Sequence, residues 1–227
     1  MFGLADRVVE FLIETCPNHI KQSILWNEPR FLVRTTCSGA GAPEEALSQI
    51  VAACKRVREQ DANEFPKFEI HSCSVCDNNK DCRTLLEGRH KKDTCIFGDL
   101  LNFLPKRDRD AIDKLHETNE EPFEEMKKII STSQIKPNAP CWQHPLKPCQ
   151  RQEAHIEIAG THCQPWSQVG DKRKQNDPRS VLVLLWAKIV LEDKIPIVIQ
   201  IGYAVPLILR RVHRGSVPGD TSDLSGA

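Results

Sequence analysis

The sequence has no excess of charge of either sign, because its 31 basic and 31 acidic side chains cancel. A chain-wide electrostatic attraction to nucleic acid is therefore excluded, and any such contact has to come from local basic clusters. The sequence also lacks the basic segment and apolar block of a secretory signal, and no apolar stretch reaches the roughly 18–20 residues of a membrane span. We therefore expect an intracellular protein that contacts no membrane.

Cysteine, in contrast, is well represented, with ten residues in a chain of 227. A framework of disulfides is typical of small secreted domains, which cannot build a sufficient apolar core. A chain of this length can bury a core of its own and shows no secretory signal. We therefore expect the cysteines to be reduced thiols.

Cysteine and histidine side chains in the middle of the chain raise the alternative of a structural zinc ion. Only Cys73 and Cys76 have the two-residue separation of a common ligand pair, and Cys73 is expected to end a strand. The other intervals match no standard four-ligand pattern, so we expect no metal site. The remaining candidates are Cys82, Cys95, Cys141, His144 and Cys149.

Strand and helix signals alternate along most of the chain. Clusters of β-branched and aromatic residues predict strands, and apolar residues at helical spacing predict helices. This alternation predicts parallel strands joined by right-handed crossovers, and thus a doubly wound, Rossmann-like α/β sheet with flanking helices. The expected strands are residues 31–37, 68–73, 94–97, 155–159 and 195–200, and the expected helices are residues 44–58, 79–86 and 181–191.

The chain divides into an N-terminal helical extension, a core and a C-terminal tail, which are residues 1–30, 31–200 and 201–227. Residues 100–151 interrupt the alternation of strands and helices within the core. A charged stretch at 108–130 predicts a helix there, and a loop with several prolines and cysteines follows at 136–148. We interpret residues 100–151 as an insertion.

Two glycine-bearing turns follow neighbouring predicted strands. The first opens a helix, so its backbone N–H groups would face a ligand at the carboxyl edge of the sheet. Such a turn alone is about as often structural as ligand-binding, and Asp99 in the second turn could be a helix N-cap. Together the two turns favour a ligand site. The residues of the first turn are Cys37, Ser38, Gly39, Ala40 and Gly41, and the second contains Gly98 and Asp99.

The loop after the fourth predicted strand carries the most specific motif in the chain. Residues 160–170 read Gly-Thr-His-Cys-Gln-Pro-Trp-Ser-Gln-Val-Gly. This resembles the catalytic signature Gly-x-Pro-Cys-Gln-x-x-Ser-x-x-Gly of the cytosine carbon-5 DNA methyltransferases. The resemblance implies that Cys163 is the nucleophile and that Gln164 and Ser167 complete the catalytic motif. Without these flanking residues, an ordinary partly buried thiol would be the simpler interpretation of Cys163.

The two glycine turns follow the order of the cofactor motifs in this family. Residues 37–41 resemble its first motif, usually Phe-x-Gly-x-Gly-Gly, with Cys37 in place of Phe and Ala42 in place of the last Gly. Residues 98–100 read Gly-Asp-Leu and resemble its Gly-Asp-Ile/Leu motif. The resemblance implies that Asp99 approaches the adenine amino group of the cofactor.

The family also has an acidic residue at the end of the intervening strand, which binds the ribose hydroxyls. Ser74 and Val75 occupy the expected positions here, and Asp77 is the nearest acidic substitute. The resemblance thus implies S-adenosylmethionine as the cofactor, with Asp77, Asp99 and the first turn as its binding residues.

The activity implied by the resemblance is methyl transfer to carbon 5 of cytosine, in DNA or in RNA, through a covalent cysteine adduct. The polar, basic loop at 171–179 has the character of the loop that closes over a flipped cytosine in this family. The attack requires a thiolate, and Arg173 and Lys174 are candidate cations that would lower the pKa of Cys163. A nuclear location would follow if the source is eukaryotic.

Two departures from the family pattern favour an alternative, a catalytically inactive domain that retains binding of cofactor or nucleic acid. His162 replaces the proline before the catalytic cysteine, so a rigid turn is lost. Ile201 stands where the family has the glutamate of a Glu-Asn-Val motif. We expect a chain that is truncated or divergent after Gln200, without a target-recognition region. A Rossmann-type oxidoreductase is a third alternative, which the absence of a dinucleotide-binding fingerprint disfavours.

Overall fold

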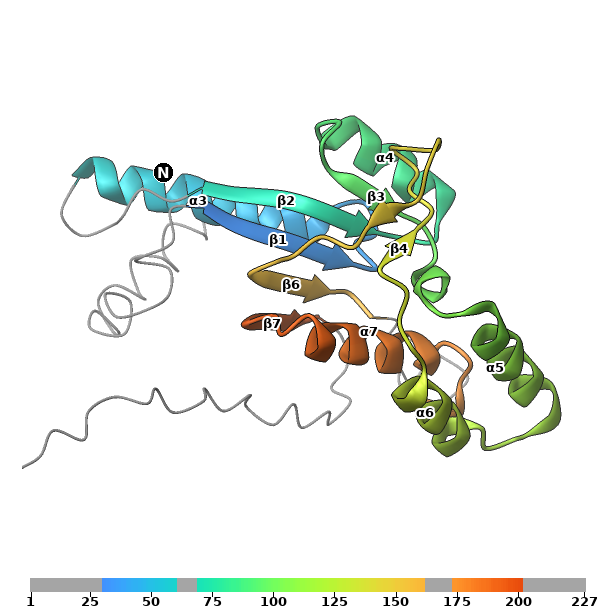
Figure 1. The fold of residues 1–227 in the computed structure, drawn as a ribbon. Helices are drawn as coiled ribbons and strands as arrows, with labels where there is room; N and C mark the ends of the chain where they lie inside the picture. Colours follow the sequence, from blue (N-terminus) through green and yellow to red (C-terminus); the bar gives the residue numbers. More distant parts are fainter. Residues whose placement is uncertain (1–29, 61–68, 162–172, 202–227) are drawn as a thin grey trace, which may run out of the picture.

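The computed structural model describes residues 30–60, 69–161 and 173–201, and a five-stranded parallel sheet lies at its centre (Figure 1). The strand order is β3-β2-β1-β6-β7, and every neighbouring pair is parallel. The expected doubly wound α/β architecture is therefore confirmed. The strands are β1 (Arg30–Thr36), β2 (Glu69–Cys76), β3 (Cys95–Phe97), β6 (Ile156–Ala159) and β7 (Ile197–Gln200).

Side chains of the strands alternate between two apolar layers, as expected for a sheet covered on both faces. On one face, Phe31 and Val33 of β1 cluster with β6 and with Leu47 of helix α3, while Val75 of β2 packs with Leu86 of α4. On the other face, the larger cluster includes Cys76, Phe97 and the α7 residues Leu185 and Trp186. The helices are α3 (Ala42–Gln60), α4 (Lys80–Arg89) and α7 (Ser180–Glu192).

The expected single helix at residues 108–130 is wrong, because the structure has two helices there. Asn119 ends the first helix in an extended conformation and accepts a hydrogen bond from the backbone N–H of Glu121. Pro122 then precedes the second helix, and a proline cannot continue a preceding helix because it lacks an N–H group. The elements are η2 (Leu100–Phe103), α5 (Lys106–Thr118) and α6 (Phe123–Thr132), followed by the short antiparallel pair β4 (Asn138–Ala139) and β5 (Cys149–Gln150).

Residues 100–151 pack against the main core rather than standing apart from it. Ile112 of α5 and Met126 of α6 belong to the same buried cluster as Trp186 of α7. The ammonium group of Lys188 also donates to the backbone carbonyls of Ser131 and Ser133, at 2.8 and 2.7 Å. Within the described residues, no helix is long and apolar enough to cross a membrane.

A buried ion pair between Arg34 of β1 and Glu157 of β6 crosslinks the centre of the sheet. Glu157 is fully buried and accepts further hydrogen bonds from Thr36 Oγ1 at 2.6 Å and Trp186 Nε1 at 3.1 Å. Arg34 also donates to Asp193, just after α7, at 2.7 Å. The network thus joins β1, β6 and α7, and satisfies a charge that burial alone would penalise.

Candidate functional site

A cavity lies at the point where the strand order of the sheet reverses. The chain passes from β1 through β2 to β3 on one side, and then returns to β6 on the other side of β1. Open α/β sheets bind their ligands at this point, outside the carboxyl ends of the strands. The cavity has a volume of about 530 Å³. Its lining includes Cys37 and Gly39 after β1, Asp77 after β2, Gly98 and Asp99 after β3, and Gly160 after β6.

The turn after β1 follows a path that depends on left-handed backbone conformations. The φ angles of Cys37, Gly39 and Gly41 are 54°, 57° and 90°. Glycine adopts such angles without the steric strain of a Cβ atom, whereas Cys37 adopts one despite its side chain. Ser38, between them, is buried and donates its backbone N–H to the carbonyl of Cys76 at 3.2 Å. The turn is therefore fixed against the end of β2.

Asp77 connects this turn to the next strand. One carboxylate oxygen accepts the backbone N–H of Gly39 at 2.8 Å, and the other accepts that of Asn79 at 2.8 Å. Strand β2 continues to Cys76, three residues beyond its expected end at Cys73, so Asp77 is the first residue after the strand. The acidic position expected at Ser74 or Val75 lies inside the strand, where both residues are buried.

Asp99 occupies the corresponding position after β3. Its Oδ1 atom accepts the backbone N–H of Leu101 at 2.9 Å and caps the short helix η2. The same residue lines the cavity, so the capping role and the ligand-facing position coexist. The structure thus brings Asp77 and Asp99 to one cavity with Cys37 and Gly39 of the glycine turn. The other predicted binding residues of the turn, Ser38, Ala40 and Gly41, do not line it.

Cys37 is not suited to act as a nucleophile at neutral pH. Burial raises the pKa of its thiol to about 12, with a further contribution from the negative charge of Asp77. A thiol with this pKa remains protonated, and only the thiolate is strongly nucleophilic. Cys37 therefore forms part of the cavity wall and is not a reactive thiol.

The predicted catalytic residues Cys163, Gln164 and Ser167 lie outside the described residues. The structure describes β6, which precedes their segment in the chain, and β7, which pairs with β6 in the sheet. Thr161, after β6, accepts a hydrogen bond from the Gln200 side chain of β7 at 3.0 Å. Ile201 donates its backbone N–H to the Ala159 carbonyl at 2.8 Å, and its side chain is 53% exposed. No carboxylate is therefore present at the residue that follows β7.

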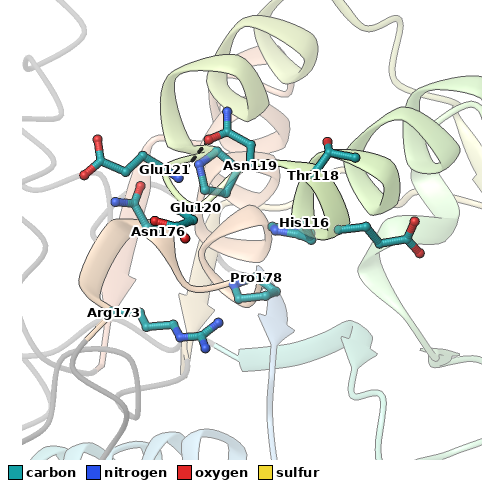
Figure 2. Close-up of a pocket in the computed structure, with 10 residues that line it drawn as sticks. His116, Thr118, Asn119, Glu120, Glu121, Arg173, Asn176 and Pro178 are labelled. Carbon is teal, nitrogen blue, oxygen red and sulfur yellow. Dashed lines mark hydrogen bonds between the residues drawn. The ribbon is translucent and has the colours of Figure 1, made fainter.

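A larger cavity of about 630 Å³ lies between the α5–α6 turn and the segment before α7 (Figure 2). His116 of α5, Glu120 of the turn and Arg173 are among its lining residues. Burial lowers the pKa of His116, which favours a neutral imidazole. None of the described residues that line this cavity directly follows a strand of the sheet, whereas the smaller cavity is lined by the residues after four strands. The smaller cavity is therefore the better candidate for a cofactor site.

A cluster of potential metal ligands was missed by reasoning from sequence spacing. The ligand atoms of Cys95, Cys141, His144 and Cys149 all lie within 4.8 Å of one another. No metal site was expected from the sequence, because the intervals between these four residues match no standard four-ligand pattern. The signal that could have found the site is the short Cys-x-x-His-x-x-x-x-Cys run at residues 141–149.

The cysteine pair with the more familiar spacing does not form a metal site with these residues. Cys73 Sγ donates to the Val33 carbonyl at 3.3 Å, and Cys76 Sγ donates to the Gly98 carbonyl at 3.0 Å. Both thiols are buried within or at the end of β2 and bond to backbone instead. The two-residue spacing of Cys73 and Cys76 therefore belongs to a strand whose thiols bond to backbone carbonyls, and not to a pair of metal ligands.

No protein-family model matches the chain, and no curated protein is significantly similar to it. The chemistry of the site therefore has to be inferred from the residues that form it.

Proposed function

We propose that this chain binds S-adenosylmethionine at the carboxyl edge of its sheet, as a methyltransferase-like protein of the cytosine carbon-5 type. The observation that carries this proposal is the convergence of Asp77, Asp99 and the glycine turn after β1 on one cavity. Its volume of about 530 Å³ lies in the range of about 300–1,000 Å³ typical of small-molecule sites.

The residues present suit the chemistry of this cofactor. Asp77 and Asp99 would accept hydrogen bonds from the ribose hydroxyls and the adenine amino group, following the family motifs that they resemble. Each oxygen of the Asp77 carboxylate already accepts one backbone N–H, but a carboxylate oxygen can accept two hydrogen bonds. Within the turn that opens α3, the N–H groups of Ser38, Gly39 and Gly41 are already bonded inside the protein. The positive end of the helix dipole would therefore provide the attraction for the carboxylate of the methionyl part.

The chemical step would depend on the segment that contains Cys163. When bound, S-adenosylmethionine supplies a methyl group activated by the sulfonium charge. The Cys163 thiolate would add to carbon 6 of cytosine, and this makes carbon 5 nucleophilic enough to accept the methyl group. Loss of the carbon 5 proton and elimination of the thiolate would then release the product. The addition step places electron density on the ring, which requires a donor at the ring nitrogen.

A second candidate function is binding of the cofactor or of nucleic acid without turnover. The observation that favours it is Ile201, whose exposed apolar side chain stands where the family has the donating glutamate. Both candidates share the same cofactor site, so cofactor binding tests what they have in common.

Isothermal titration calorimetry with S-adenosylmethionine and its demethylated product provides the test. The wild-type chain should bind, and Asp99→Ala should bind about 10- to 100-fold more weakly, because a hydrogen bond to a charged group contributes about 1.5–3 kcal/mol. Asp110→Ala, which removes an exposed carboxylate of α5, is the matched control and should bind like the wild type. Absence of heat at millimolar ligand, with a sample shown to be folded by circular dichroism, would exclude the proposal.

A further inference from the structure

Three thiols surround one nitrogen of an imidazole beside the edge strand β3. Cys95 begins β3, whereas Cys141, His144 and Cys149 come from the segment between β4 and the end of β5. The Nδ1 atom of His144 lies 3.3 Å from Cys149 Sγ, 3.4 Å from Cys141 Sγ and 3.9 Å from Cys95 Sγ. The cluster is partly shielded from water, because Cys95 and Cys141 are each 5% exposed.

These separations fit the edges of a tetrahedron around one zinc ion. Zinc binds cysteine sulfur at about 2.3 Å and histidine nitrogen at about 2.0–2.1 Å, so a tetrahedral site places its sulfur and nitrogen ligands about 3.6 Å apart. The three nitrogen–sulfur distances here are distributed around that value, and all four ligand atoms lie within 4.8 Å of one another.

The other ring nitrogen of His144 makes the contact expected of a metal-bound histidine. His144 Nε2 lies 2.8 Å from the backbone carbonyl of Lys92, a distance at which Nε2–H donates a hydrogen bond. A proton on Nε2 leaves the lone pair of Nδ1 directed at the three thiols. Histidines that bind metals usually donate their second nitrogen in this way, which fixes both the tautomer and the ring orientation.

We propose that Cys95, Cys141, His144 and Cys149 form a structural zinc site. Three sulfur ligands and one nitrogen suit zinc, whereas magnesium and calcium prefer oxygen ligands. Four protein ligands complete a tetrahedral shell and leave no position for water or substrate, which distinguishes a structural site from a catalytic one. The site is therefore separate in chemistry from the proposed cofactor cavity.

The loop at residues 140–148 buries little apolar surface, because Cys141 is its only buried residue. Leu146 is 99% exposed, and the strands β4 and β5 that flank the loop have two residues each. Metal binding would fasten the loop to β3 across a separation of 46 residues, counted from Cys95 to Cys141. A metal that closes so long a loop can supply the stability that the loop cannot derive from apolar burial.

The same loop is connected to the backbone around Asp77 through Arg83 of α4. Trp142 donates its backbone N–H to the Ile96 carbonyl at 2.7 Å, and its ring lies 4.9 Å from the guanidinium carbon of Arg83. Arg83 in turn donates to the carbonyls of Asn78 and Asp77, at 2.6 and 3.0 Å. Loss of the metal should therefore weaken cofactor binding as well as the local fold, and this second consequence rests on the proposed function.

The metal content of the full chain, purified without chelators, tests the site directly. Inductively coupled plasma mass spectrometry should find about one zinc ion per chain in the wild type, as expected for a site with four protein ligands. Cys149→Ser and His144→Ala should lose the metal, and Cys82→Ser, a cysteine of α4 outside the cluster, should retain it. Wild-type protein that is folded yet contains no stoichiometric zinc, and takes up none from added zinc chloride, would overturn the proposal.

A spectroscopic measurement on the wild type tests the site without any substitution, so its result does not depend on whether the variants fold. Replacement of zinc by cobalt should give the sulfur-to-cobalt charge-transfer bands and the intense visible bands of a tetrahedral thiolate site. A disulfide between Cys141 and Cys149, detected as two thiols missing from a titration of the denatured, chelator-treated chain, would also overturn it. Neither result depends on whether S-adenosylmethionine binds, so failure of the two proposals can be distinguished.

Discussion

The carboxylate of Asp77 accepts the backbone N–H of Gly39 at 2.8 Å, so the end of β2 fixes the turn that follows β1. This contact makes the two halves of the proposed cofactor site depend on each other. The acidic side chain holds the turn in position through this hydrogen bond to a backbone N–H group. Substitutions that push the neighbouring strand ends apart should therefore weaken ligand binding, even where the substituted residue does not contact the ligand.

Gly160 offers a direct test of this dependence. A Cβ atom at this position would lie 2.8 Å from the backbone carbonyl oxygen of Cys37, which is closer than such atoms can approach. Gly160→Ala should therefore force apart the ends of β1 and β6 and destabilise the fold by about 1–3 kcal/mol, as overpacking commonly does. Urea unfolding, monitored by circular dichroism, measures the change.

Gly88 is the matched control for this substitution. It lies in α4, and a Cβ atom added there meets nothing within 4 Å. Gly88→Ala should stabilise the protein by about 0.5–1 kcal/mol, because alanine favours a helix more than glycine does. Equal stability changes in the two variants would contradict the close contact between Gly160 and Cys37.

The contact between Asp108 and Ser133 predicts a pH-dependent stability. The hydroxyl of Ser133, at the end of α6, donates to Asp108 Oδ2 at 2.6 Å, and this hydrogen bond is the largest cause of the lowered pKa of Asp108. Because the folded-state pKa lies below the usual 3.8, the ionised form stabilises the fold. This contribution is complete above about pH 4 and is lost as the pH falls through the folded-state pKa.

Asp108→Ala should consequently be less stable than the wild type by about 1.5–3 kcal/mol at pH 7, with a smaller difference at pH 3. Asp110→Ala on the same helix removes an exposed carboxylate and should change stability by less than about 0.5 kcal/mol at either pH. Urea unfolding at the two pH values gives the comparison. A difference between wild type and Asp108→Ala that stays constant with pH would exclude the ionised Asp108 as its source.

How far sequence patterns predict this structure differs between its elements. The strands at 31–37 and 155–159 were predicted because β-branched and aromatic residues cluster there. The buried Glu157 was not, since an Ile-Glu-Ile pattern usually directs the acid to solvent. Its burial depends on Arg34, which lies 123 residues earlier in the chain. The proximity of Cys95 to Cys141 was not predicted for the same reason. Spacing along the chain contains no information on which distant segments meet in the fold.

The identity of the nucleophile can be tested by covalent trapping. A DNA duplex containing 5-fluorocytosine cannot lose a proton from carbon 5, so an enzyme that has methylated it stays attached. Cys163→Ser should abolish this adduct in the presence of S-adenosylmethionine, because serine is a far weaker nucleophile. Cys37→Ser should form whatever adduct the wild type forms, since the thiol of Cys37 is protonated at neutral pH. A detectable adduct that the wild type and Cys163→Ser form equally, in a denaturing gel-shift assay, would exclude Cys163 as the nucleophile.

Methyl transfer by the chain itself should be close to background. Addition of a thiolate to carbon 6 builds electron density on the pyrimidine ring, and the family meets this demand with a glutamate at the ring nitrogen. Ile201 offers no hydrogen-bond donor from its side chain, and its backbone N–H is already bound to the Ala159 carbonyl at 2.8 Å. Loss of one well-placed acid or electrostatic stabiliser commonly lowers a rate by about 10²–10⁴.

Replacement of residues 201–203 by Glu-Asn-Val should therefore raise the transfer of a labelled methyl group to cytosine-containing DNA. The matched control is Gln-Asn-Val at the same positions, which restores the shape of the side chain without a carboxyl group that can donate a proton. Only the glutamate variant should gain activity, and the gain should disappear when Cys163→Ser is added. Transfer by the unaltered chain at about 1 s⁻¹ or faster, a rate typical of enzymes in general, would instead show that the glutamate is dispensable.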